Sequence, residues 1–184
     1  MPRLPFPADT DAFPEHTREA VRYIQETRGS LPPPSTYLAY AGEPGKRLAD
    51  LAACLRFKTS LTDAETELAI CAAARAMDAD YIWSAHVRLG LAAGTREEAI
   101  HAVDTYGPLD GLTDDEKLII TYSRELLEDR RVNDATFEAV RQRWGEAGAL
   151  EMTAVMSVYL MNATVLRAMD HKPGPDARWL TPRG

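Results

Sequence analysis

Two side chains, His86 and Glu67, are of the types that transfer protons, and both are predicted to lie in apolar surroundings. A helical repeat places His86 on one face with Ile82 and Trp83. An imidazole among such neighbours can act as a general acid or base near neutral pH. Glu67 directly precedes the uncharged run 68–74, so burial should raise the pKa of its carboxyl unless a partner offsets the effect. A core histidine and a helix-rim glutamate are the structural alternatives.

The other residue types that carry chemistry form no recognisable site in the sequence. The two cysteines, Cys54 and Cys71, form no CxxC pair, which excludes a disulfide scaffold and fits a reduced cytoplasmic setting. Cys71 is predicted to be buried in an alanine-rich helix, where a thiol is inert. No HxxxH or HExxH spacing indicates a metal site, and no glycine-rich phosphate loop or GxSxG motif is present. We therefore expect neither a metal nor a cofactor.

Charge and hydropathy exclude further classes. The 184-residue chain has a formal net charge of -7 and no cluster of basic residues, which argues against nucleic acid as a partner. The N-terminal residues contain no apolar signal-peptide core. The apolar stretch 147–169 includes Glu151, Asn162 and Arg167, so we expect a buried or interface helix there and no membrane span. A small anionic substrate remains compatible with this composition.

The elements that must position His86 and Glu67 are all predicted to be helical. No segment alternates with the period of two that a strand would need, and proline or glycine residues separate the helices. The segment 31–35, with three consecutive prolines, is predicted to be an extended connector. The chain after His171 is predicted to be extended. The helices are expected at about 11–28, 44–57, 62–77, 81–93, 95–106, 133–144 and 147–169, with a further helix that begins at about 112.

Several helix starts have capping signals. Thr62 is followed by Glu65 at the capping-box spacing, and the run Leu-Thr-Asp-x-Glu that contains them recurs at 112–116. Thr95 with Glu98 is predicted to cap a further helix. The recurrence suggests a duplicated helical hairpin in which only the first copy carries a carboxylate at the position of Glu67.

The order of these features resembles the carboxymuconolactone decarboxylase and alkylhydroperoxidase D-like family. The resemblance rests on Glu67, on His86 with the following run VRLGLAAG at 87–94, and on a late apolar helix with Tyr159 and Asn162. It covers about residues 30–170. It implies an all-α alkylhydroperoxidase D-like bundle of about seven or eight helices, and a homo-oligomer such as a trimer or hexamer. We expect a single domain over 1–184, with extensions at both ends of that core.

The resemblance also bears on the reaction. The family's peroxidase branch uses a CxxC pair just before the histidine, and here those positions hold Ala79 and Ile82, so no peroxidatic thiolate is expected. The decarboxylase branch often has a glutamate four residues before the histidine, where this chain again has Ile82. A residual thiol peroxidase using Cys71 is a remote alternative.

The resemblance implies a cofactor-independent lyase or isomerase that acts on a small carboxylated lactone or aromatic ring-cleavage product. In this hypothesis His86 transfers a proton and Glu67 orients its imidazole. The alternative is a non-catalytic helical oligomer of the same fold, either ligand-binding or vestigial. Arg88 could bind a substrate carboxylate, or it could be a solvated helix arginine. The candidates for substrate contact are Tyr81, Ile82, Trp83 and Arg88.

Overall fold

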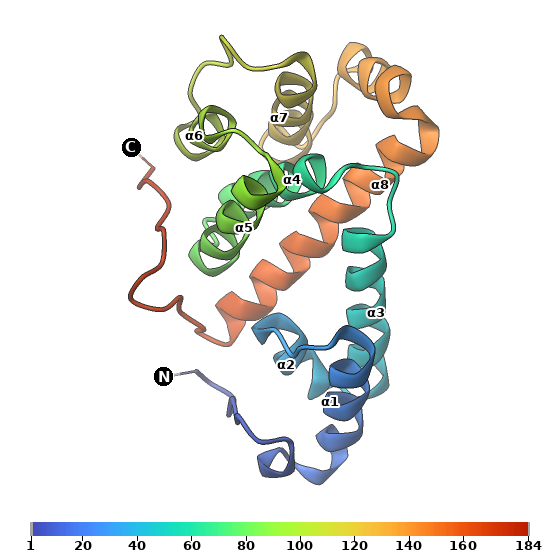
Figure 1. Cartoon of the computed structure of the whole chain (residues 1–184), viewed down its shortest axis with the longest axis vertical. Helices are drawn as coiled ribbons and strands as arrows, with labels where there is room; N and C mark the ends of the chain where they lie inside the picture. Colours follow the sequence, from blue (N-terminus) through green and yellow to red (C-terminus); the bar gives the residue numbers. More distant parts are fainter. Residues whose placement is uncertain (1, 184) are drawn as a thin grey trace. The chain divides into compact units, whose positions relative to one another are not determined.

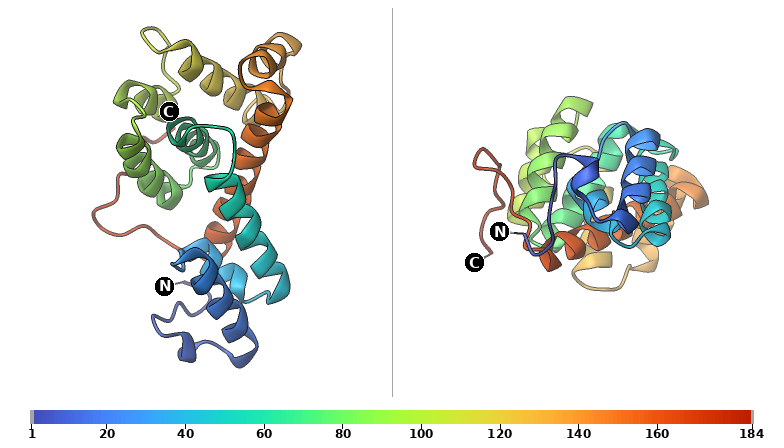
Figure 2. Two further views of the ribbon diagram at one scale, coloured as in Figure 1. Left: turned by 45° about the vertical axis from the view of Figure 1, so that its right-hand side comes forward. Right: turned by 90° about the horizontal axis from the view of Figure 1, so that it is seen from below.

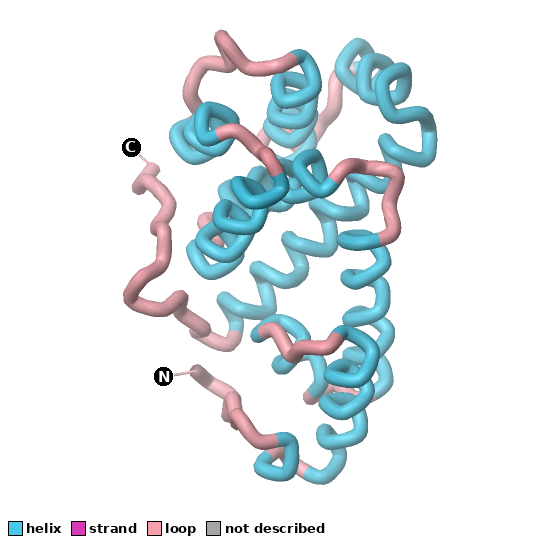
Figure 3. Tube along the Cα trace, in the orientation of Figure 1, coloured by secondary structure: helices cyan, strands magenta, loops and turns pink. Residues whose placement is uncertain are grey.

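The computed structural model describes residues 2–183, which form eight α-helices, one short 3₁₀ turn at Thr10–Ala12 and no β-strand (Figure 3). The predicted all-α class is therefore confirmed. The helices are α1 (Glu15–Arg28), α2 (Pro33–Ala39), α3 (Glu43–Phe57), α4 (Asp63–Ala76), α5 (Asp80–Ala93), α6 (Glu97–Thr105), α7 (Asp114–Leu127) and α8 (Asp134–Ala168).

The helices form two compact units. The first contains the described residues up to Lys58 together with Met161–Lys172, and the second contains Thr59–Leu160 and the described residues from Pro173 onward. The prediction of a single domain over the whole chain stays a prediction.

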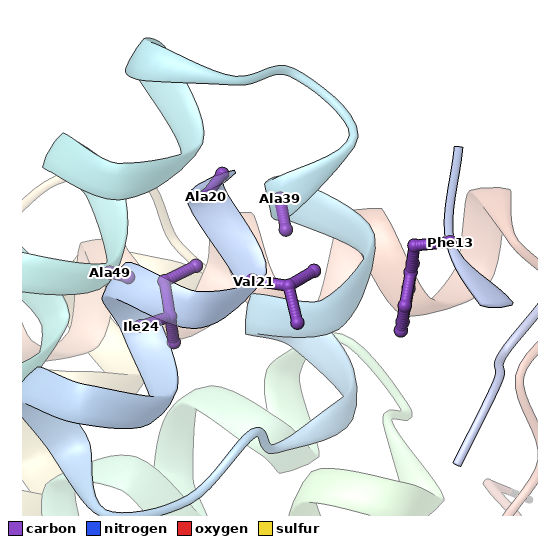
Figure 4. Close-up of a cluster of buried hydrophobic side chains, with 6 residues drawn as sticks. All are labelled: Phe13, Ala20, Val21, Ile24, Ala39 and Ala49. Atoms are coloured by element: carbon purple, nitrogen blue, oxygen red, sulfur yellow. The ribbon is translucent and has the colours of Figure 1, made fainter. Parts of the chain in front are cut away.

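In the first unit, α1, α2 and α3 pack against one another around a small apolar cluster (Figure 4). Its buried members are three larger apolar side chains and three alanines, and the alanines let the helix backbones approach closely. They are Phe13, Ala20, Val21, Ile24, Ala39 and Ala49. Gly29 ends α1 in the left-handed conformation, with φ 67°, as a C-terminal glycine is expected to do.

The proline-rich connector is shorter than predicted. Pro32 is extended, with φ −67° and ψ 151°, but α2 already begins at Pro33. The first turn of a helix has amide groups without intrahelical partners, so Pro33 and Pro34 lose no hydrogen bond there and their fixed φ suits the helix. The prediction of an extended segment over 31–35 is therefore wrong from Pro33 onward.

Helix α4 is the centre of the second unit, where it packs against α5, α6 and α7 (Figures 1 and 2). All ten residues from Thr66 to Arg75 are buried, as the uncharged run in the sequence predicts for a helix without a solvated face. Capping boxes at Thr62 and Thr113 start α4 and α7, which confirms both predicted signals. Because α4 is central and buried, its side chains are shielded from water and suit chemistry that requires the exclusion of water.

The predicted cap at Thr95 is wrong. The residue at the N-cap of α6 is Arg96, and its side chain makes no capping hydrogen bond. The Thr95 hydroxyl instead donates to the backbone oxygen of Ala64 at 3.1 Å. The preceding Gly94, with φ 99°, ends α5 as predicted. Thr95 therefore joins the end of α5 to the start of α4.

Helix α8 takes the place of two predicted helices. Gly145, with φ 73° and ψ 177°, interrupts it at the predicted break, and that backbone conformation is open almost only to glycine. By length and composition α8 could cross a membrane, but 50% of its most apolar window is buried inside the protein. Core helices of soluble proteins pass the same test.

The chain after α8 contains no helix in its described part, as predicted. Its last stretch, 173–183, is called the C-terminal segment below. This segment is held to the second unit by hydrogen bonds. The Leu180 amide donates to Asp80, and the amide and hydroxyl of Thr181 both donate to the carboxylate of the buried Asp104.

Candidate active site

Helices α4 and α5 bring Glu67 and His86 together. Oε2 of Glu67 lies 2.6 Å from Nδ1 of His86, and the two side chains are only 7% and 9% exposed. Gly90 allows the close packing, because a Cβ atom there would lie 3.4 Å from Cβ of Glu67 and 3.2 Å from the hydroxyl of Thr95. The two residues singled out from the sequence thus form one buried pair (designated the Glu67–His86 pair).

The hydrogen bond determines which imidazole nitrogen is basic. An ionised carboxylate can only accept hydrogen bonds, so Nδ1 of His86 donates its proton to Glu67. In the neutral ring, Nε2 then carries the lone pair and acts as the base. The carboxylate also stabilises the imidazolium that forms when Nε2 takes up a proton. The arrangement therefore suits reversible proton transfer at Nε2.

An aromatic side chain from α8 completes the surroundings of the imidazole. The ring of Tyr159 meets the ring of His86 edge-on, with 4.8 Å between centroids and an interplanar angle of 80°. This contact limits rotation of the imidazole about its side-chain bonds. Tyr159 was not among the predicted site residues, because nothing in the spacing of the sequence connects it to His86. Only the packing of α8 in the second unit makes it a neighbour.

Ile82 and Trp83 lie on the same helix face as His86 and are buried, with 2% and 0% of their surface exposed. The indole Nε1 of Trp83 has no hydrogen-bond partner among residues 2–183. Ile82 occupies the position where the decarboxylase pattern has a second acid, so on this face of α5 the ionisable group beside Ile82 and Trp83 is His86. Both residues provide an apolar environment in which charge–charge interactions are strong.

Tyr81 and Arg88 lie elsewhere on α5. Together with the C-terminal segment they line a cavity of about 570 Å³ whose lining includes neither His86 nor Glu67. Arg88 is exposed and two residues from His86, which is about 200° around the helix. Tyr81 is partly buried, and burial raises the pKa of its phenol. The structure therefore does not bring Arg88 to the Glu67–His86 pair.

The thiol nearest the pair belongs to Cys71, one turn beyond Glu67 on α4. It is fully buried, and burial, with a smaller contribution from the charge of Glu67, holds the pKa of this thiol far above its ordinary value. Cys54 is exposed on α3 and lies in the other unit. Neither cysteine is placed as a reactive thiolate beside His86.

Metal ligation finds no support in the part of the chain that the structure describes. No group of three or more His, Cys, Asp or Glu side chains within residues 2–183 is arranged to hold a metal ion.

Comparison with known proteins places the pair in a family context. Residues 43–105, from the first residue of α3 to the last of α6, match the model of the carboxymuconolactone decarboxylase family. This range includes both Glu67 and His86. No curated protein sequence matches the chain significantly.

Solved structures share the fold at low sequence identity. A peroxidase-related protein of Ralstonia eutropha JMP134 with an alkylhydroperoxidase AhpD core superposes with a TM-score of 0.73 at 19% identity, covering 95% of this chain and 93% of that one. A peroxidase-related protein of Silicibacter sp. TM1040 gives 0.71 at 16% identity, covering 96% and 93%. A variant of the debrominase Bmp8 in complex with 2,3,4-tribromopyrrole gives 0.67 at 14% identity, covering 93% and 90%.

The family match and the shared fold agree with the resemblance seen in the sequence. Residues 43–105 of this chain are thus similar to the carboxymuconolactone decarboxylase family, and the chain shares its fold with two peroxidase-related proteins, one of them with an alkylhydroperoxidase AhpD core.

Proposed function

We propose that this chain is a cofactor-independent lyase or isomerase that acts on a small carboxylated lactone or a related ring-cleavage product. The observation that carries the proposal is the buried hydrogen bond of 2.6 Å between Glu67 and His86. The match of residues 43–105 to the decarboxylase family model supports this class of substrate.

In the proposed mechanism, Nε2 of His86 transfers the proton. During decarboxylation the carbon–carboxylate bond breaks, carbon dioxide leaves, and the electron pair stays on the ring carbon. That carbon then takes a proton from Nε2 of the imidazolium, and the imidazole returns to its neutral form. In an isomerisation, Nε2 removes a proton from one carbon and returns it to another. Glu67 holds the imidazole in position and stabilises its charged form in both cases.

The residues around the Glu67–His86 pair favour a reaction in which one imidazole both accepts and donates the proton. Ile82 replaces the second acid of the decarboxylase pattern, so the same imidazole has to take up and deliver the proton. An isomerisation meets this condition directly, because one base can serve both carbons. Decarboxylation needs only this one imidazole when His86 starts as the imidazolium, the form that the adjacent Glu67 carboxylate favours.

Thiol chemistry is disfavoured at this site. The positions of the peroxidase cysteines hold Ala79 and Ile82, and Cys71 is buried with a strongly raised pKa. At 14% identity, the likeness to the debrominase extends to the fold and not to its reaction. General acid/base catalysis by the pair is therefore the function that the geometry supports best.

The test is turnover of 4-carboxymuconolactone, followed by ultraviolet absorbance, in the native protein and in two histidine variants. His86→Ala should lower kcat by about 10²–10⁴-fold, the usual contribution of one acid/base group. His101→Ala is the matched control, because His101 is exposed on α6, and it should retain full activity.

The outcomes separate the possible readings. Equal activity of His86→Ala and the native protein would refute the acid/base role of His86. Absence of turnover by correctly folded native protein would reject this substrate. Absence of turnover with isomerisable unsaturated lactones as well would favour the non-catalytic alternative.

A further inference from the structure

A second polar site lies in the same unit, where three arginines surround the ring of Tyr106. The guanidinium carbons of Arg75, Arg183 and Arg124 lie 5.0, 5.1 and 5.9 Å from the ring centroid. Arg75 comes from the end of α4, Arg124 from α7, and Arg183 from the C-terminal segment, while Tyr106 follows the last residue of α6. Three positive side chains from three separate elements therefore meet at one aromatic ring.

These side chains line a cleft of about 590 Å³. The C-terminal segment forms one wall of the cleft. The other lining residues are Thr105, Glu128, Asp129, Thr181 and Pro182. The volume is sufficient for a small organic ligand.

The guanidinium of Arg75 is buried with an incomplete set of partners. Arg75 is only 3% exposed. Its Nη1 donates to the backbone oxygen of Thr181 at 2.8 Å and lies 3.4 Å from the carboxylate of Asp78. Its Nε is buried and has no hydrogen-bond partner among residues 2–183. A buried charged donor without an acceptor is costly, so an acceptor bound in the cleft would stabilise this group.

Arg124 has acceptors but no counter-charge. Its Nη2 donates to the backbone oxygens of Ala102 and Gly107, at 3.0 Å each. No carboxylate within residues 2–183 forms an ion pair with it. Burial lowers the pKa of Arg124, because the desolvation of its charge outweighs its interaction with Tyr106. A bound anion would supply the missing charge.

The nearby carboxylates are directed mainly toward Arg183. Glu128 accepts from the hydroxyl of Tyr106 at 2.5 Å and pairs with Arg183 at 3.3 Å. Asp78 lies 2.9 Å from Nε of Arg183. These contacts leave Arg124 without an ion pair among residues 2–183 and Arg75 with one contact of 3.4 Å to Asp78, while Asp129 also lines the cleft.

We propose that this cleft is a binding site for a small oxyanion, a carboxylate or a phosphate, held between Arg75 and Arg124. Planar guanidinium groups match both kinds of oxyanion through paired hydrogen bonds. Because Thr181 and Arg183 form one wall of the cleft, a bound oxyanion also stabilises the docked C-terminal segment. The site shares no residue with the Glu67–His86 pair and does not depend on the function proposed for that pair.

Nuclear magnetic resonance of the arginine Nε–H groups tests the proposal directly. The protein is titrated with sodium phosphate and, separately, with sodium benzoate, with sodium chloride at matched ionic strength as the reference. The Nε–H signals of Arg75 and Arg124 should shift and saturate with at least one of the two oxyanions. Which of them saturates the signals identifies the source of the oxyanion. Shifts that never saturate, or that chloride reproduces, would overturn the proposal.

Two variants make the assignment specific. Arg124→Gln removes one guanidinium from the cleft and should weaken oxyanion binding by about tenfold or more, as expected for lost hydrogen bonds to a charged group. Arg131→Gln makes the same change of charge at an exposed position outside the cleft, and its affinity should stay close to that of the native protein. An equal loss of oxyanion affinity in both variants would show that overall charge accounts for the binding. It would contradict the proposed site.

Discussion

Replacing Glu67 by Gln keeps the shape of the side chain in the buried pair but removes its charge. The Oε2–Nδ1 distance of 2.6 Å and side-chain exposures of 7% and 9% identify a desolvated, charge-assisted hydrogen bond. Hydrogen bonds to charged groups contribute about 1.5–3 kcal/mol. Glu67→Gln should therefore lower the free energy of unfolding by that amount. Glu67→Ala leaves the imidazole donor without its acceptor and should cost about 3–5 kcal/mol.

The assay follows from the placement of the tryptophans. The sequence has three, Trp83, Trp144 and Trp179, and all lie in the unit that contains the pair. Urea unfolding followed by tryptophan fluorescence therefore reports on that unit. A double-mutant cycle of Glu67→Gln with His86→Gln isolates the interaction between the two side chains.

One outcome of the cycle would contradict a stabilising interaction between Glu67 and His86. A coupling energy below about 0.5 kcal/mol would mean that the two side chains lie close together without stabilising each other. Glu98→Gln is the control, because Glu98 is an exposed glutamate on α6. Its effect should stay within about 0.5 kcal/mol.

Three further predictions concern stability and reactivity. Thr62→Ala removes the hydroxyl that caps α4 and should lower the free energy of unfolding by about 1 kcal/mol in the same urea assay; an unchanged midpoint would contradict this. Ellman's reagent should modify exposed Cys54 in the native protein and Cys71 only after unfolding, since burial raises the Cys71 pKa; native reaction of both would refute it. Burial lowers the pKa of His171, whose Nδ1 lies 3.0 Å from the Tyr37 hydroxyl. The unfolded state then binds the proton more readily, so the stabilising contribution of His171 is present above about pH 6.5 and is lost as pH falls through the folded pKa. The protection factors of amides in the first unit, which correct for the intrinsic pH dependence of exchange, should fall between about pH 7 and pH 5, and less so in His171→Gln.

Local signals allowed most helices to be predicted. Thr62 and Thr113 act within four residues of chain, so their capping boxes are visible in the sequence and present in the structure. Glycines at helix ends are equally local, as Gly29 and Gly94 show. Thr95 differs because its hydroxyl bonds to Ala64, a residue on another helix. Competition between a local cap and a distant acceptor cannot be judged from spacing alone.

The sequence indicated which residues of the candidate site could carry chemistry, but not which of them would lie together. Apolar periodicity indicated that His86 lies on an apolar face and that Glu67 lies beside an apolar run, with a glutamate at the helix rim as the alternative. The contact between the two side chains depends on how α4 and α5 pack. The ring of Tyr159 and the arginines around Tyr106 converge from elements far apart in the sequence. Which of these elements pack together depends on the tertiary structure. The spacing of apolar residues within one segment does not reveal it.

The C-terminal segment has a consequence for proteolysis. Irregular chain is usually where proteases cut, and this segment contains Arg178 and Arg183. In the docked state the guanidinium of Arg178 is paired with Glu97, and that of Arg183 with Asp78 and Glu128. Trypsin must take the arginine side chain into its own acidic pocket, so each arginine has to leave its partners before cleavage. The rate of tryptic cleavage after Arg178 would therefore measure how often this part of the segment detaches from the folded protein.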